Sequence, residues 1–131
     1  MPLEAPFERW IQRARSSLAL ARKVDDDIAY EDLCFSAQQA AEKAVKALFV
    51  HRNWDYPYTH DLATLFTILS DRGIQAPDRV RDSAMLSEYA SFTRYPGSAP
   101  AVTADEYKDA IRAAEEVLDW VISMLPASER S

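Results

Sequence analysis

Apolar residues recur along most of this chain at steps of three and four positions, which is the spacing of one face of an α-helix. Prolines and the two glycines, Gly73 and Gly97, interrupt this pattern and predict where helices begin or end. Runs that alternate apolar and polar residues, which are typical of strands, are missing. Helices are expected at residues 6–23, 28–52, 60–72, 77–92 and 104–125. The sequence therefore predicts an all-α, five-helix up-and-down bundle.

The second predicted helix has the clearest pattern, because almost every apolar residue falls on one stripe. Its small side chains allow close approach by another helix, and they are Ala37, Ala40, Ala41, Ala44 and Ala47. Two interpretations of its polar stripe are open. Glu42 and Lys46, one turn apart, could form an exposed ion pair. Alternatively, Gln39, Lys43 and Lys46 could hold a phosphate or a base edge. In that interpretation they face Arg94 across a groove.

Short polar sequences predict how three of the helices begin. The acidic run at residues 25–27 is expected to cap the second helix, and Thr59 is expected to cap the third. Thr103 and Glu106 have the spacing of a capping box at the start of the last helix. Carboxylates and hydroxyls at these positions can accept hydrogen bonds from the free N–H groups of a first turn.

The link between the second and third helices is rich in aromatic side chains. Trp54, Tyr56 and Tyr58 follow Arg52, and aromatic rings beside a cation can stack an exposed nucleobase. Packing of these rings over the end of the bundle is the alternative. His60 comes next, and it could either bond to a neighbouring loop or take part in catalysis.

Composition and charge limit the classes of function. A length of 131 residues fits one domain, residues 1–131, with residues 126–131 as a frayed tail. The net charge of −6 argues against a nucleic-acid platform over the whole surface, but it allows a local basic site.

The single Cys34 lies on an apolar helix face, which indicates a buried thiol. Together with the lack of a leader sequence, it indicates a cytoplasmic protein. No apolar run is long enough to span a membrane, and neither a metal nor a cofactor is expected.

Three short stretches carry a resemblance to a known family. The first is the alanine- and glutamine-rich segment at residues 34–48, the second is Thr59-His60-Asp61-Leu62, and the third is Arg94-Tyr95-Pro96. In their order and spacing they resemble the HEPN (higher eukaryotes and prokaryotes nucleotide-binding) domain family over nearly the whole chain. The resemblance implies a HEPN-type bundle that usually forms a homodimer. Such domains are often encoded beside a minimal nucleotidyltransferase, as a toxin–antitoxin or RNA-processing pair.

The candidate site residues follow from this resemblance and from the polar stripe of the second helix. Candidates for nucleotide or RNA binding are Gln39, Lys43, Lys46, Arg94 and Tyr95. Many members of the wider superfamily are metal-independent ribonucleases with an arginine followed, after four to six residues, by a histidine. This chain departs from that motif, because residues 99–101 contain no histidine. Arg94 and His60 remain the candidate catalytic residues.

Three functions remain open from the sequence. The first is a binding module that contacts a nucleotide, RNA or a partner nucleotidyltransferase. The second is a metal-independent ribonuclease with a non-standard active site. The third is a helical scaffold without a ligand. Cleavage of RNA needs one group to remove a proton and another to return it, and imidazole suits both roles near neutral pH. The missing histidine therefore favours binding over turnover.

Overall fold

The computed structural model of this chain describes residues 6–90 and 100–126. Within these residues there are five α-helices, one 3-10 helix and no strand. The elements are α1 (Pro6–Ala21), α2 (Tyr30–His51), α3 (Leu62–Asp71), α4 (Asp78–Arg81), the 3-10 helix η1 (Asp82–Ala90) and α5 (Ala104–Met124). The predicted all-α bundle is confirmed. In the described part of the chain, no helix is long and apolar enough to cross a membrane.

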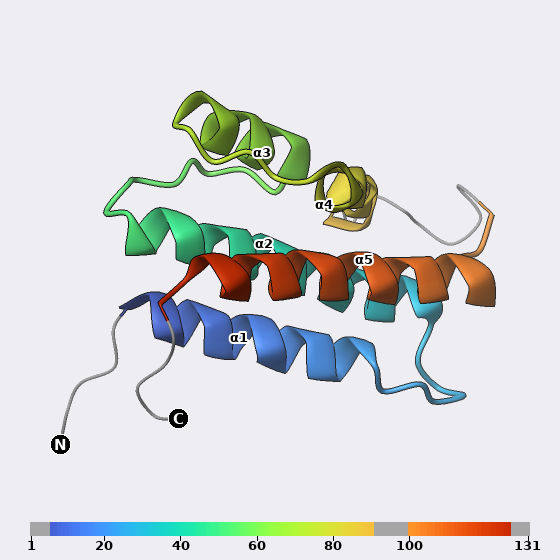
Figure 1. Ribbon diagram of the computed structural model, residues 1–131. Helices are drawn as coiled ribbons and strands as arrows, with labels where there is room; N and C mark the ends of the chain where they lie inside the picture. The colour runs from blue at the N-terminus through green and yellow to red at the C-terminus, as the bar shows by residue number, and fades with distance from the viewer. Residues whose placement is uncertain (1–5, 91–99, 127–131) are drawn as a thin grey trace, which may run out of the picture.

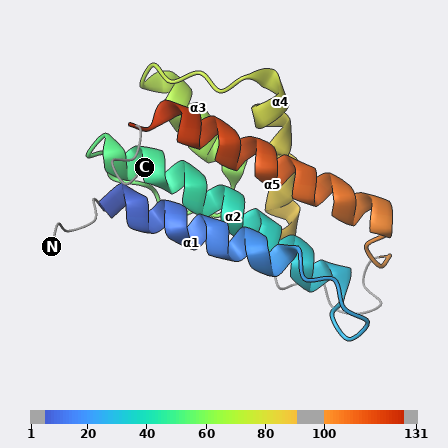
Figure 2. The ribbon, with the colours of Figure 1, turned by 60° about the horizontal axis from the view of Figure 1, so that its bottom comes forward.

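Helix α2 lies at the centre of the bundle (Figure 1). It runs antiparallel to α1, and Figure 2 shows it between α1 and α5. Helix α3 and the 3-10 helix η1 also pack against α2. The five alanines of α2 named above are all fully buried, as is Cys34. Their small side chains allow the neighbouring helices to approach the α2 backbone closely.

The predicted fourth helix, residues 77–92, is wrong as a single α-helix. A short α4 continues instead into the 3-10 helix η1, and residues 91 and 92 lie outside the described part. The buried residues of this segment recur at steps of three, and they are Val80, Ser83, Leu86 and Tyr89. Three residues per turn is the period of a 3-10 helix, so this geometry turns the three residues of η1 toward the core. Tyr89 is a core residue.

Two of the three predicted caps are wrong. Helix α2 begins after Ala29 without a side-chain cap, and Asp25 instead accepts a hydrogen bond from the backbone N–H of Asp27. Helix α3 begins after Asp61 rather than Thr59, and the Ser87 hydroxyl accepts its first N–H, that of Leu62, at 2.8 Å. Because Ser87 belongs to η1, tertiary packing supplies the partner that a local cap would otherwise give.

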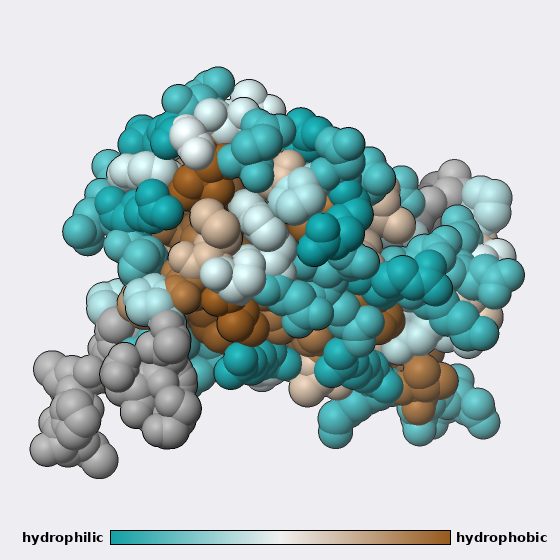
Figure 3. Space-filling view, viewed as in Figure 1, coloured by the Kyte–Doolittle hydropathy of each residue, from teal (hydrophilic) through white to brown (hydrophobic). Residues whose placement is uncertain are grey.

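The remaining helix boundaries agree with the sequence pattern. Thr103 and Glu106 form the capping box of α5, with reciprocal bonds of 3.1 and 2.9 Å. Gly73 follows α3 with φ +94°, a left-handed conformation that favours glycine. Hydrophilic side chains cover much of the face seen in Figure 3. Large apolar side chains that stay exposed include Leu20, Val24 and Tyr58.

Candidate functional site

A buried carboxylate, Glu42 on α2, lies at the centre of a polar network. Its Oε2 accepts a hydrogen bond from Lys46 Nζ at 2.7 Å, and its Oε1 lies 2.8 Å from His60 Nδ1. The Glu42 and Lys46 side chains are only 7% and 9% exposed, so the prediction of an exposed ion pair is wrong. The His60 ring lies at the surface and is 67% exposed. The network therefore joins a buried charge to an accessible imidazole.

Gln38, one turn before Glu42, holds both the carboxylate and the link that precedes α3. Its Nε2 donates to Glu42 Oε1 at 2.9 Å and to the His60 carbonyl at 3.2 Å. Its own Oε1 accepts from Gln39 Nε2 at 2.8 Å. Every polar atom of this fully buried amide thus has a partner, which offsets the cost of burying it. Residue 60 is fixed to α2 through its main chain as well as its side chain.

The protonation states in this network follow from the donors around Glu42. Burial is the largest single influence on its pKa and raises it. The hydrogen bonds that the carboxylate accepts, together with the charge of Lys46, outweigh burial, so the pKa lies below its ordinary value of 4.5. An ionised carboxylate only accepts hydrogen bonds. His60 Nδ1 must therefore carry the proton of this bond, and in the neutral ring Nε2 is left with a lone pair.

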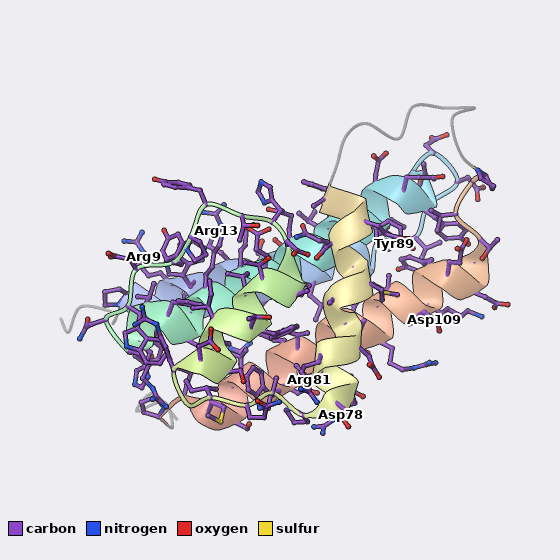
Figure 4. All side chains as sticks on the ribbon, turned by 90° about the horizontal axis from the view of Figure 1, so that it is seen from above. Arg9, Arg13, Asp78, Arg81, Tyr89 and Asp109 are labelled. Carbon is purple, nitrogen blue, oxygen red and sulfur yellow. The ribbon has the colours of Figure 1, made fainter. Side chains whose placement is uncertain are left out.

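A second feature is a hollow of about 510 Å³ between α1 and α2, which we call the basic hollow. Its lining residues are Pro6, Arg9, Trp10, Gln12, Arg13 and Lys43. Three of these side chains are cations and none is a carboxylate. Figure 4 labels Arg9 and Arg13, which stand one helical turn apart on α1. The chain as a whole carries a net charge of −6, so this is a local concentration of positive charge.

Lys43 is the most constrained cation of the basic hollow. Its Nζ donates to Ser17 Oγ of α1 at 2.8 Å. Burial lowers the pKa of Lys43, and the like charge of Arg13 lowers it further against the opposing charge of Glu42. The positive charges of Arg13 and Lys43 thus repel each other at the basic hollow. A bound anion would offset this repulsion.

The basic hollow and the Glu42 network are neighbours. Trp10 of the hollow contacts the Tyr56 ring edge-to-face, with centroids 5.2 Å apart. The Lys46 ammonium lies 5.3 Å from the centroid of the same Tyr56 ring. Tyr56 therefore contacts a residue of each feature.

The candidate binding residues from the sequence analysis have different partners in the structure. Lys43 faces the basic hollow, Gln39 donates to Gln38, and Lys46 is committed to its ion pair with Glu42. Lys46 is therefore better placed to hold Glu42 than to hold a phosphate. Arg94 and Tyr95 lie outside the described residues, and so does the predicted groove between them and α2.

The aromatic side chains of the link between α2 and α3 also differ in their surroundings. Trp54 packs edge-to-face on Phe49, with centroids 6.2 Å apart, so packing over the bundle end holds for this ring. Arg52 and Arg72 also lie over it. Tyr58 is fully exposed and is the ring of the link that remains open to a ligand.

Sequence reasoning missed the cations of α1 and the partnership between Glu42 and His60. Arg9 and Arg13 stand one helical turn apart beside Trp10, a spacing that could have indicated a shared face. The Glu42 partnership depends on how the link folds over α2, and no local spacing gives that. In the described part of the chain, no group of three or more His, Cys, Asp or Glu side chains is arranged to hold a metal ion.

Comparison with known proteins places this architecture in one family. The HEPN domain profile matches residues 7–125. The crystal structure of TT1696 from Thermus thermophilus is similar, with a TM-score of 0.78 and 30% identity over 93% of this chain and 100% of that chain. An archaeal HEPN homologue, ST0689, has a TM-score of 0.73 and 29% identity over 90% of this chain and 96% of that chain. The comparison with curated proteins finds no match. The chain belongs to the HEPN domain family.

Proposed function

We propose that this HEPN domain is a nucleotide- or RNA-binding module that works beside a minimal nucleotidyltransferase. The observation that carries the proposal is the basic hollow, where three cations and no carboxylate line one concavity of an acidic chain. Phosphate neutralisation requires such a local excess of positive charge. The resemblance to HEPN domains supports the partner and the homodimeric state.

The chemistry of the basic hollow suits a phosphate next to a base. The guanidinium groups of Arg9 and Arg13 can each donate two parallel hydrogen bonds to phosphate oxygens. Lys43 adds a cation that Ser17 holds in place. The half-buried ring of Trp10 offers a stacking surface at the same hollow. A volume of about 510 Å³ is also within the usual range for small-ligand sites.

The test is binding of a labelled single-stranded oligoribonucleotide, and of ATP, followed by fluorescence anisotropy and calorimetry in chelator. The double variant Arg13→Ala/Lys43→Gln removes two charges from the basic hollow. The matched control, Lys108→Gln/Arg112→Ala, removes the same charge from exposed positions on α5.

We expect at least tenfold weaker binding for the hollow variant, because each charge-assisted bond contributes about 1.5–3 kcal/mol. The control should bind within about twofold of the wild type, and raising the salt should weaken binding. Equal losses in both double variants would assign binding to overall charge and refute the site. No binding by the wild type would refute the proposed function.

The partner and the homodimer have their own tests. Co-expression with a minimal nucleotidyltransferase, followed by size-exclusion chromatography, should give a single complex peak. Light scattering of the isolated chain should give twice the monomer mass of 14.8 kDa. A monomer at micromolar concentration that elutes apart from the nucleotidyltransferase would argue against both associations while leaving RNA binding to be judged separately.

A further inference from the structure

Lys43 differs from the other lysines of this chain in its surroundings. The chain has four lysines, Lys23, Lys43, Lys46 and Lys108. Lys23 and Lys108 are exposed, and Lys46 is buried in its ion pair with Glu42. Lys43 is half-buried and lines the basic hollow, where no carboxylate stands among the described lining residues. Its side chain therefore faces a space of about 510 Å³ that is lined by other cations.

The amine of Lys43 is held in place and is more readily uncharged than an ordinary lysine amine. Its Nζ donates to Oγ of the buried Ser17 at 2.8 Å. Burial lowers the pKa of Lys43, and the charge of Arg13 lowers it further against the opposing charge of Glu42. A lysine that is partly desolvated beside another cation is a better nucleophile at neutral pH, because more of it is present as the free amine.

A structural explanation would be that the hydrogen bond between Lys43 and Ser17 ties α2 to α1. Such a tether does not require Arg9 and Arg13, which stand one helical turn apart at the same hollow. Guanidinium groups bind phosphate oxygens through parallel hydrogen bonds. The basic hollow thus combines two groups suited to hold a phosphate with one nucleophilic amine.

We propose that Lys43 is an acylation site whose donor is an acyl phosphate, the mixed anhydride of a carboxylic acid and phosphoric acid. Arg9 and Arg13 bind the phosphate oxygens and so bring the acyl group to the amine. The regulatory consequence rests on the proposed function. An acylated Lys43 is neutral, so the basic hollow loses one of its three cations and binds RNA or a nucleotide more weakly.

The acyl transfer needs no further reactant. The free amine of Lys43 attacks the acyl carbon, and a bond forms between Nζ and that carbon. The bond from the acyl carbon to the phosphate oxygen breaks, and the phosphate leaves with the electron pair. The nitrogen gives one proton to the departing phosphate, so the products are an N-acyl lysine and inorganic phosphate. Arg9 and Arg13 stabilise the phosphate as its charge increases.

The test is incubation of the folded protein with acetyl phosphate at neutral pH. Peptide mass spectrometry measures the acetylation of each lysine over time, and the exposed Lys23 and Lys108 serve as internal references. Arg9→Gln removes one of the phosphate-binding groups, and Arg112→Gln at an exposed position of α5 is the matched control. Acetic anhydride, which carries no phosphate, shows how much of the selectivity depends on phosphate binding.

We expect acetyl phosphate to acetylate Lys43 at least about tenfold faster than Lys23 or Lys108. Arg9→Gln should slow the reaction at Lys43 at least about threefold, and Arg112→Gln should leave it unchanged. Added inorganic phosphate should compete, and acetic anhydride should show a smaller preference for Lys43. A rate at Lys43 no higher than at the exposed lysines would refute the proposal, and so would equal rates in the two arginine variants.

Fluorescence anisotropy then measures RNA binding before and after the reaction. Acetylation should weaken binding by the wild type at least about tenfold, whereas Lys43→Arg keeps the charge and should bind equally before and after treatment. Equal losses in both proteins would assign the effect to the other lysines and refute the regulatory consequence. Selective acetylation of Lys43 in a chain that binds no RNA even before treatment would support the acylation site and refute the proposed function.

Discussion

Replacing Glu42 by glutamine tests the buried network at its centre. The change is nearly isosteric, but the new amide has one acceptor and one donor group where the carboxylate has two acceptors. Lys46, only 9% exposed, is then left as a buried cation without its counter-charge. Breaking a buried pair by removing one partner costs about 3–5 kcal/mol. Since the glutamine oxygen can still accept one of the bonds, we expect a loss of about 3 kcal/mol in the free energy of unfolding.

Urea unfolding followed by circular dichroism measures this loss. The matched control is Glu116→Gln on α5, whose carboxylate pairs with the exposed Arg79 at 2.6 Å. That change should cost less than about 1 kcal/mol, because exposed ion pairs contribute little. A second variant, Glu42→Gln/Lys46→Met, removes both charges and should recover part of the loss. A cost at Glu42 no larger than that at Glu116 would refute the description of Glu42 as the centre of a buried network.

The contribution of Glu42 to the free energy of unfolding should also depend on pH, in a direction that its pKa shift gives. The pKa of Glu42 is lower in the folded protein than its ordinary value of 4.5. Its ionisation therefore stabilises the fold above pH 4.5, and this contribution is lost as the pH falls through the lower, folded-state value. The stability gap between the wild type and Glu42→Gln should accordingly shrink below pH 4.5. A gap that widened on acidification would contradict the direction of the shift.

Three further changes test other parts of the structure, each by thermal or urea unfolding. Gly73→Ala should cost about 1–2 kcal/mol, because φ is +94° and no atom within 4 Å of the new Cβ adds a clash; no loss would mean that the turn relaxes. Thr103→Ala should cost about 1 kcal/mol through the capping box of α5, while Thr103→Ser should behave as the wild type. Arg13→Gln should leave stability unchanged or slightly raised while RNA binding weakens, since it removes the like charge beside Lys43; a clear loss of stability would indicate a structural role for Arg13.

The long helices could be predicted because their apolar spacing is local and regular. Helix α2 extends over Tyr30–His51, within two residues of the predicted bounds at each end. The α4–η1 segment was missed because steps of three and of three to four differ little over a dozen residues. The distinction came from burial of Ser83, a polar residue whose hydroxyl donates to the Ala113 carbonyl at 3.2 Å. The sequence also could not show that Ser87 would serve the start of α3.

The candidate site was predictable only in part. The polar stripe of α2 indicated Lys43 and Lys46 as neighbours, but packing gives them different partners, Ser17 for one and Glu42 for the other. Whether a charged pair one turn apart is exposed depends on what folds over it. Here the link that carries His60 covers the stripe, and contacts over a sequence separation of 18 residues bring that histidine to Glu42.

The hypothesis of a ligand-free scaffold can be weighed against two features of this surface. Folding alone requires that buried polar groups find partners, and Gln38, Glu42 and Lys46 do so with one another and with Gln39 and His60. It does not require Arg13 beside Lys43, where burial and a like charge both disfavour the charged form of the lysine. Nor does it require an imidazole that is oriented through Nδ1 while most of its side chain is exposed to solvent. Features that do not stabilise the fold, or that destabilise it, are typical of functional sites. The two features are neighbours, because the Tyr56 ring contacts Trp10 of the one and lies beside Lys46 of the other.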